Sequence, residues 1–474
     1  MKKQAFAAIA LASSVFLPAG RSVDLIAIGS ISGTYEDFAT ETAAPLENGI
    51  PGNRLGGIGS GLAYAGGTTF LALPDRGPNA NPYNSLVDDT VSYIARFQTL
   101  NLSLAPSTDP LTGLPFTLTP MLTNTTLLSS PTPLVYGSGA GLGNQIDGVT
   151  PLGSGAPTLN AIDHTHYFTG RSDNFDPNQL STDPRDARID PESIRVSNDG
   201  KSVFVSDEYG PFVYEFDRMT GKRIKSFALP ANLAITVVSS QKDVEITNNT
   251  VGRVTNKGME GLAITRDGKT LVGIMQANLE QDKKGSLRIV TIDIGTRTTH
   301  EYAYILTDGS GVSDILAVNN HQFLVDERDG NGLGDTPLLT DKASAAKIKR
   351  LYLIDLDGAV DVTNIAGPNA DLSGFGVAKT LFLDVVAKLK GAGVNALLIP
   401  SKIEGIAFGQ DVVVNGETKH TLVIANDNDF LATVADPFKQ PGDATRGMIA
   451  NPNEFYVFAF ADGELPEFVP QQIK

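Results

Sequence analysis

The hydrophobic pattern of the chain consists of short apolar runs, each entered by a polar or charged residue. Three segments show it best: Asp190–Ile194, Gly258–Leu262 and Lys402–Ile406 each bring a glutamate to the start of an apolar run. After a turn and a second apolar run, these units end in polar clusters, at Asp207-Glu208, Gln276 and Asn426-Asp427. A motif that recurs with its polar residues in the same place indicates a repeat architecture whose repeats converge on one site.

Three weaker copies extend the pattern. They run from Ser60–Ala63 to Asp75-Arg76, from Ile146–Val149 to Gly170–Asp173, and from Ser313–Ile315 to Asp326–Gly330. Six units over residues 60–430 predict an all-β propeller, with six blades preferred and seven as the next choice, because the innermost strand of each blade starts near a central channel. The alternative is a series of strand and turn signals without a common centre.

Hairpin signals dominate the segments between these units. Apolar runs such as Ser202–Ser206 and Thr270–Met275 follow Asp-Gly turns, which supply the positive φ angles that a two-residue turn requires. Helical patterns are confined to residues 341–349 and 380–390. Each unit spans about 70 residues, more than a four-stranded blade needs. We therefore expect long inserted loops at residues 101–145, 330–349 and 365–400, with one or two short helices.

The N-terminus has the order of a secretory signal peptide. Lys2 and Lys3 precede the apolar stretch Ala5–Leu17, and the small residues Ala19-Gly20 follow it. This stretch is too short to span a membrane, and no later stretch has the roughly 18 apolar residues of a transmembrane helix. We expect residues 1–20 to be a signal peptide, residues 23–474 to be one propeller domain, and the protein to be periplasmic or secreted. A buried N-terminal helix is the alternative.

The net charge and the absence of cysteine exclude several classes of partner and of catalytic chemistry. The formal charge is 37 − 53 = −16, which disfavours nucleic acids and anionic membrane surfaces as partners. The chain has no cysteine, so disulfides and thiol catalysis are excluded. It also has no G-x-S-x-G elbow, no H-E-x-x-H motif and no Walker loop. The expected partner is a small molecule, and an anion is among the candidates. We expect neither binding to nucleic acid nor insertion into a membrane.

If the units face one channel, its mouth gathers carboxylates and amides with few basic side chains. So many carboxylates cannot stay ionised together unless something compensates them. Carboxylate and amide oxygens are the ligands that Ca²⁺ prefers. We therefore predict a calcium site drawn from Asp75, Asp207, Glu208, Asp326, Glu327, Asn426 and Asp427. The alternative is a set of salt-bridge networks alone.

The three repeated glutamates are the strongest candidates for catalysis. Glu192, Glu260 and Glu404 each enter a run that must be a buried strand, where a charge is costly unless it is paired or bound to metal. The glycine after Glu260 and Glu404 permits close approach of a neighbouring backbone. The alternative is that these glutamates accept backbone N–H bonds from adjacent blades and so lock the ring.

Two weaker signals stay open. His164 and His166 lie two apart and would share a face on a strand, which suits a base or a binding pair; display on the surface is the alternative. Glu327–Gly332 carries oxygen donors before a glycine but lacks the final glutamate of an EF-hand loop. It is either a turn that holds a cation or an ordinary glycine-rich turn.

Six phrases together resemble the phytase-like family, exported bacterial propeller proteins named for an esterase-like activity of phytase. They are Gly170–Asp173, Asp190–Ile194, Asp207–Pro211, Gly258–Leu262, Glu327–Gly330 and Asn426–Asp429. The resemblance covers roughly residues 50–460 and implies a β-propeller and a hydrolase of phosphate or carboxylate esters. A looser similarity to calcium-dependent propeller lactonases, of the gluconolactonase and paraoxonase kind, implies one Ca²⁺ held by residues from inner strands.

The leading hypothesis is an exported, metal-dependent hydrolase of phosphate or carboxylate esters. The cation would act as a Lewis acid and lower the pKa of bound water. The alternatives are a calcium-dependent lactonase and a non-catalytic exported propeller that binds a ligand or acts as a scaffold. Basic side chains are too few for a dense phosphate cradle, which speaks against phytate itself. Catalytic candidates are Glu192, Glu260, Glu404, Arg76 and Arg328, and substrate-binding candidates are Arg171, Lys257, Lys402 and His164.

Overall fold

The computed structural model of the chain describes residues 23–474, except residues 80, 108–112 and 366–369. The predicted signal peptide therefore lies outside the described residues. Within them, no helix has the length and apolar character needed to cross a membrane.

The described residues form five antiparallel sheets, each with four strands in series. Blade 1 contains β2 (Gly61–Tyr64), β3 (Thr69–Leu73), β4 (Arg96–Pro106) and β5 (Phe116–Leu127). Blade 2 contains β8 (Pro191–Val196), β9 (Ser202–Asp207), β10 (Phe212–Asp217) and β11 (Arg223–Ala228). Blade 3 contains β12 (Met259–Ile264), β13 (Thr270–Met275), β14 (Ser286–Asp293) and β15 (Thr299–Ile305). Blade 4 contains β16 (Gly311–Ala317), β17 (Gln322–Arg328), β18 (Lys349–Asp355) and β19 (Lys379–Asp384).

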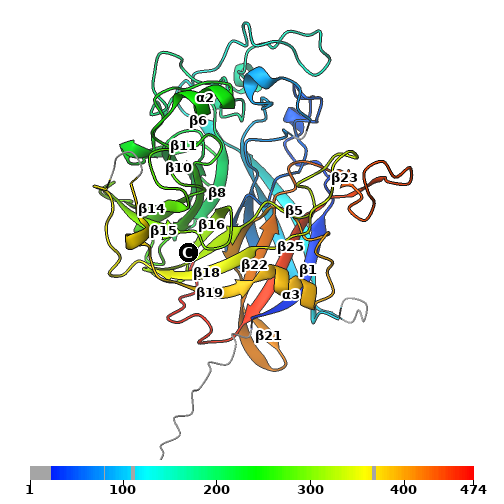
Figure 1. Cartoon of the computed structure of the whole chain (residues 1–474), viewed down its shortest axis with the longest axis vertical. Coiled ribbons are helices and arrows are strands. Elements are labelled where there is room, and N and C mark those ends of the chain that lie inside the picture. The colour runs from blue at the N-terminus through cyan, green and yellow to red at the C-terminus, as the bar shows by residue number, and fades with distance from the viewer. Residues whose placement is uncertain (1–22, 80, 108–112, 366–369) are drawn as a thin grey trace, which may run out of the picture.

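Blade 5 joins the two ends of the described chain. Its order is β20 (Ile403–Phe408), β22 (Glu417–Asn426), β25 (Asn453–Phe460) and β1 (Val23–Ile31). The first strand thus supplies the outer edge of a sheet whose other strands come from the last blade, and β1 lies beside β25 in Figure 1. A short strand, β21 (Val412–Val414), also pairs with β22.

The five sheets close into a ring. The inner strand of each blade lies beside those of its two neighbours, in the order β2, β8, β12, β16, β20 and back to β2. This is an all-β propeller, as predicted, but the described residues form five blades rather than the preferred six. The unit assigned to Ile146–Asp173 is not a blade, because it holds only one two-residue strand, a short helix and loops.

Helices and minor strands decorate the blades. The helices are α1 (Leu159–Asp163), α2 (Lys242–Asn248) and α3 (Val385–Gly391), and the 3-10 turns are η1 (Thr40–Thr42), η2 (Ser85–Val87), η3 (Ala231–Leu233) and η4 (Ser373–Phe375). The remaining strands are β6 (Ser129–Ser130), β7 (His166–Tyr167), β23 (Thr433–Ala435) and β24 (Met448–Ala450). The helix expected at 380–390 is confirmed only from Val385, after β19. The one expected at 341–349 is absent from the structure, where Ala346 instead donates a backbone hydrogen bond to Ala396.

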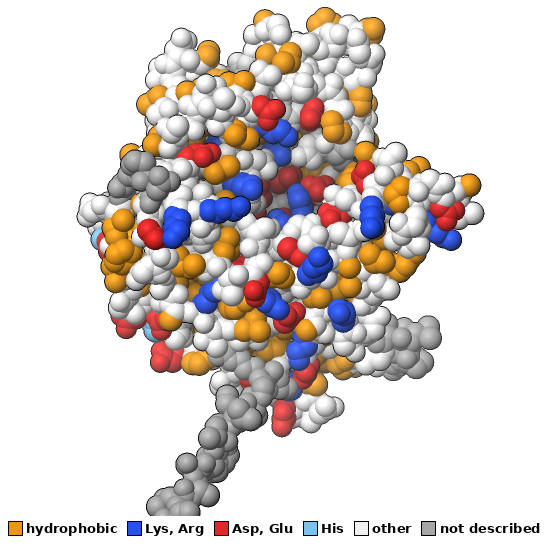
Figure 2. All heavy atoms as spheres, viewed as in Figure 1, with side chains coloured by type: hydrophobic (Ala, Val, Ile, Leu, Met, Phe, Trp, Pro, Cys, Tyr) orange, Lys and Arg blue, Asp and Glu red, His pale blue; other side chains and the backbone are white. Residues whose placement is uncertain are grey.

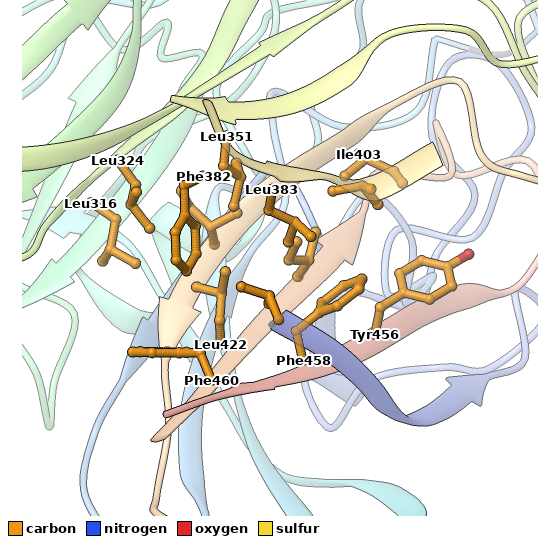
Figure 3. Close-up of a cluster of buried hydrophobic side chains, with 14 of the residues drawn as sticks. Leu316, Leu324, Leu351, Phe382, Leu383, Ile403, Leu422, Tyr456, Phe458 and Phe460 are labelled. Atoms are coloured by element: carbon orange, nitrogen blue, oxygen red, sulfur yellow. The ribbon is translucent and has the colours of Figure 1, made fainter. Parts of the chain in front are cut away.

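Apolar side chains fill the spaces between neighbouring blades. Between blades 4 and 5, Phe382 and Leu383 of β19 face Phe458 and Phe460 of β25 across a buried cluster, which Figure 3 shows. These strands carry apolar residues on both faces because each blade is covered on both sides. Burial between blades, rather than any disulfide, holds the ring together.

The centre of the ring is closed by a buried ion pair. Asp314 of β16 accepts a hydrogen bond from Ser193 of β8 at 3.0 Å and pairs with Arg195 of β8 at 2.7 Å. The same carboxylate accepts the backbone N–H of Ile406 on β20 at 3.1 Å. Three inner strands are thus tied through one side chain. The locking role considered for the repeated glutamates is filled here by Asp314.

Glycines let the inner strands approach one another closely. A Cβ added at Gly405 would lie 2.8 Å from the carbonyl oxygen of Gly59, and one at Gly261 would lie 2.8 Å from backbone atoms of Asp314. This is the close approach predicted for the glycine that follows Glu260 and Glu404.

Gly405→Ala is therefore expected to lower the free energy of unfolding by about 1–3 kcal/mol, because the inner strands must separate to admit the methyl group. Urea denaturation measures this loss. The control is Gly391→Ala at the end of α3, where a Cβ would meet no atom within 4 Å. A change at Gly405 no larger than the control would contradict the close-approach argument.

Candidate functional site

A β-bulge re-aims one side chain in four of the five inner strands. The pairing register shifts between Pro191 and Ile194, between Met259 and Gly261, between Val312 and Asp314, and between Ile403 and Ile406. The residues at these shifts include Glu192, Glu260, Ser313 and Glu404. Bulges of this kind turn side chains out of a ladder next to functional sites. Here they place one polar side chain per blade at the same end of the ring.

The second strand of each blade ends at that same edge, because it runs antiparallel to the first. Gln276 bonds back to Gly258, Glu208 to Asp190 and Asp427 to Lys402 through the backbone. Arg328 holds the corresponding place in blade 4, opposite Gly311. The starts of the inner strands and the ends of the second strands together form one polar mouth.

Two groups of three carboxyl groups meet in this mouth. Asp190, Glu192 and Glu208 offer oxygens that all lie within 4.8 Å of one another, and so do Asp75, Asp427 and Asp429. The first group comes from the start of β8 and the end of β9 in blade 2, and the second from the ends of β3 in blade 1 and β22 in blade 5. Glu260 stands beside the first group and repels Glu192 and Glu208. We call these seven side chains, together with Glu404 and the cations that pair with them (Arg76, Arg328 and Lys402), the acidic mouth.

Three cations lie among these carboxylates. Arg76 pairs with Asp190 at 2.6 Å, and Arg328 pairs with Glu404 at 2.5 Å and reaches Glu260 at 4.0 Å. Lys402 bridges Asp427 at 2.7 Å and Asp429 at 2.5 Å. The acidic mouth therefore contains eight carboxyl groups against three cations: Asp75, Asp190, Glu192, Glu208, Glu260, Glu404, Asp427 and Asp429 against Arg76, Arg328 and Lys402.

Burial and mutual repulsion raise the pKa of several of these acids. Burial and the charge of Glu260 raise the pKa of Glu192 well above its usual value, and burial and Glu208 do the same for Glu260. Burial also raises the pKa of Glu208 and of Glu404 to about 7. Burial opposes the charge of Lys402, but Asp427 and Asp429 outweigh it and raise its pKa. The mouth thus holds more carboxyl groups than its own cations can pair.

In the metal-free protein, ionisation of these buried acids is expected to lower the free energy of unfolding as the pH rises. The folded-state pKa of Glu208 and of Glu404, about 7, exceeds the 4.5 of an ordinary glutamate. The contribution of these two groups to the free energy of unfolding is complete below their pKa in the unfolded chain. It is lost as the pH rises through their folded-state pKa of about 7. Thermal melts in chelator should therefore give a higher melting temperature at about pH 6 than at about pH 8. Glu404→Gln should flatten this slope, and a melting temperature that rose over the same range would contradict the assignment.

An open polar pocket adjoins the acidic mouth at Arg76. It measures about 320 Å³ and is lined by Arg76, Asp88, Tyr209, Lys242 and Asn256, among others. Arg76 also donates a hydrogen bond to Asn256. Figure 2 shows acidic and basic side chains gathered in a hollow on the face that it presents. The pocket can hold a polar substrate next to the carboxylates.

The structure brings together nine of the residues singled out from the sequence. The acidic mouth contains Asp75, Arg76, Glu192, Glu208, Glu260, Arg328, Lys402, Glu404 and Asp427.

Four other predicted metal ligands have structural partners or lie deeper. Asp207 accepts the backbone N–H groups of Asp190, Tyr209 and Gly210 and so shapes the turn after β9. Glu327 pairs with Lys379 at 2.6 Å and accepts three backbone N–H groups, and Asn426 accepts the N–H of Glu454. Asp326 is fully buried, and neither of its carboxylate oxygens has a hydrogen-bond partner among the described residues.

The substrate-binding candidates are mostly elsewhere. Arg171 is buried against Asp173 and Glu47, at 2.5 and 3.3 Å. Lys257 is exposed, close in sequence to Asn256, and His164 is exposed after α1 with a positive φ of 54°. Of the four, the structure places only Lys402 in the acidic mouth.

Sequence reasoning missed Asp190 and Asp429 as site residues. Both lie inside the motifs used for the resemblance, and each adds the third carboxyl group to its cluster. The signal was their distance of two residues from Glu192 and from Asp427, since loop residues that flank a strand end can turn toward the same centre.

The acidic mouth fits a hard divalent cation. Its donors are carboxylate oxygens from separate chain segments, which is the donor set of Ca²⁺ sites. Glu260 is 3% exposed, and its Oε2 has no hydrogen-bond partner among the described residues. Asp190, Glu192 and Glu208 are the residues best placed to hold such an ion, because Arg76 pairs with only one of these three carboxylates, whereas Lys402 bridges two of the three in the other cluster.

The closed ring of antiparallel blades with polar residues at one end defines the chain as a β-propeller with a site at its channel mouth. The family model described as phytase-like, esterase-like activity of phytase, matches residues 53–430. The chain belongs to this family.

An uncharacterized secreted protein of Arthroderma benhamiae is 29% identical over 331 residues, which cover 59% of this chain and 60% of that protein. The chain thus spans about three fifths of the length of the curated relative it matches.

Among solved structures, the periplasmic gluconolactonase PpgL of Pseudomonas aeruginosa is 12% identical with a TM-score of 0.34, covering 93% of this chain and 100% of that one. Hydrazine synthase of Kuenenia stuttgartiensis is 10% identical with a TM-score of 0.29, covering 84% and 81%. Both likenesses are too distant to bear on what this chain does.

Proposed function

We propose that the protein is an exported, calcium-dependent hydrolase of ester bonds in small polar substrates. The observation that carries this proposal is the convergence of Asp190, Glu192 and Glu208 from separate segments within 4.8 Å, next to an open pocket. Buried carboxylates with strongly raised pKa values cluster at functional sites. The family membership and the secreted relative support a secreted hydrolase.

The residues of the site have separate roles in the proposed reaction. Arg76, tied to Asp190 at 2.6 Å, lines the pocket and would hold the oxygen atoms of a phosphate or carboxylate ester. Glu192 lies beside this pair and would, as one of the residues that hold the cation, orient the attacking water. Arg328, held by Glu404 and by Ser313, keeps the far side of the mouth fixed.

The cation would be held by Asp190, Glu192 and Glu208. When bound, it would neutralise part of the excess negative charge and act as a Lewis acid toward the ester oxygen. Linear esters and lactones present the same carbonyl chemistry, so both belong to the proposed substrate class.

Hydrolysis assays test this proposal. Turnover of at least one of p-nitrophenyl phosphate, p-nitrophenyl acetate, phytate and a simple lactone is expected in millimolar Ca²⁺, with loss of activity in chelator. Glu192→Gln should lower the rate by about a hundredfold or more, because it removes a charged ligand of the cation. Asp199→Asn, an exposed change on blade 2, is the matched control.

Failure of the whole substrate panel in Ca²⁺ would sink the hydrolase proposal. The remaining interpretation would then be a non-catalytic propeller that binds a ligand in the acidic mouth, since propellers host both roles.

A further inference from the structure

A second cavity lies apart from the acidic mouth. It measures about 280 Å³ and sits between the loop of residues 41–52, the stretch 92–96 that leads into β4, and the loop of residues 145–159. None of its lining residues lines the pocket at Arg76. This cavity therefore needs its own explanation.

The cavity offers fixed hydrogen-bonding groups at its floor. Glu47 is held by the backbone N–H of Ser92 at 2.9 Å and by the Ser92 hydroxyl at 2.5 Å. Arg96 is fully buried, pairs with Asp37 at 2.8 Å and donates to Thr42 at 3.1 Å. Its Nη2 has no hydrogen-bond partner among the described residues. This nitrogen is sealed from solvent and out of reach of a ligand. The polar groups that the cavity presents to a ligand are those of Glu41, Gln145, Ser154 and Thr158.

The charges at the cavity do not suit an anion. Its lining contains Glu41, Glu47 and Arg96, and Asp37 already compensates Arg96. An anionic ligand would face uncompensated repulsion from Glu41 at the exposed rim. A neutral ligand that both donates and accepts hydrogen bonds meets no such penalty.

Apolar side chains complete the lining. Leu46, Ile94, Pro157 and Leu159 face the same cavity as the polar groups. A sugar ring has this mixed character, because its hydroxyl groups donate and accept while its C–H faces pack on apolar surface. The volume approaches the lower end of the range for small-ligand pockets. We infer that this cavity is a binding site for a neutral sugar, independent of the ester-hydrolysing site.

Titration calorimetry with glucose, cellobiose and gluconate on the full chain tests the inference. Glucose or cellobiose is expected to bind, and gluconate to bind less tightly because of its charge. Ala44→Trp and Ala156→Trp fill the cavity and should each weaken binding by about tenfold or more, which corresponds to about 1.4 kcal/mol. Ala43→Trp, whose side chain does not line the cavity, is the control and should bind as the unaltered protein does.

Two further variants separate this site from the acidic mouth and from effects on folding. Glu192→Gln should leave sugar binding unchanged, whatever it does to hydrolysis. Glu41→Gln, at an exposed position, should alter sugar affinity without altering the melting temperature. No binding of either neutral sugar, or binding that survives both tryptophan variants, would overturn the inference. Loss of binding in Glu192→Gln would reassign the sugar to the mouth and overturn it as well.

Discussion

Replacement of Asp314 by alanine is expected to lower the free energy of unfolding by about 3–5 kcal/mol, because it leaves the charge of Arg195 buried without its partner. Asp314 is fully buried and joins Ser193, Arg195 and Ile406 at the centre of the ring. Arg195 is 3% exposed, so water cannot replace the lost carboxylate. Urea denaturation of the variant and the unaltered protein measures the difference.

A matched pair of variants shows whether the loss arises from the unpaired charge. Asp199→Ala removes an exposed partner of Lys201 at 3.9 Å and should change stability by no more than about 0.5 kcal/mol. A double replacement, Arg195→Met with Asp314→Leu, should recover much of the loss, since both buried charges are gone. If Asp314→Ala were as mild as the surface control, the ring would not depend on this ion pair.

Addition of Ca²⁺ to chelator-treated protein is expected to raise the melting temperature by a few degrees. A ligand that binds only the folded state at a hundredfold excess over its Kd stabilises it by about 2.7 kcal/mol. In a chain of 474 residues this corresponds to a shift of a few degrees. The physical cause is relief of repulsion among Asp190, Glu192 and Glu208.

The choice of ion and variant makes this measurement specific. Mg²⁺ should restore less than Ca²⁺, because it demands tighter octahedral geometry. Glu192→Gln and Glu260→Gln should each reduce the calcium response, whereas Glu327→Gln, whose residue contacts Lys379, should keep it. If neither chelator nor Ca²⁺ changed the melting curve, the calcium site would be contradicted. The carboxylates would then serve only in salt bridges with Arg76, Arg328 and Lys402.

The sequence predicted the propeller class but not its blade count. The units led by Glu192, Glu260 and Glu404 are blades, and those at Ser60 and Ser313 follow the same scheme. The unit at Ile146 has turn residues like the others but too few apolar residues to form four paired strands. Identifying repeat units by their turn residues alone therefore predicts too many blades.

The repeated motif predicted which glutamates lie together at the starts of the inner strands. The prediction failed where the direction of a side chain depends on strand alternation or on a loop. Adjacent strand residues face opposite sides, so in β17 Arg328 reaches Glu404 while Glu327 turns to Lys379. A run of consecutive polar residues cannot by itself show which of them faces the mouth. Asp190 and Asp429 belong to connecting segments, whose direction the apolar pattern does not encode.

The pairing of β1 with β25 has a consequence for how the molecule is made. The first strand of the described residues, Val23–Ile31, pairs with the last, Asn453–Phe460. Contacts this distant in sequence form slowly, because the entropy cost of closing a long loop comes before the contacts contribute any stability. Until then the edge of β25 is open to pairing with another chain. A nascent chain released before Asn453 would lack β25, the strand with which β1 pairs. Premature termination should therefore yield aggregates rather than a smaller propeller.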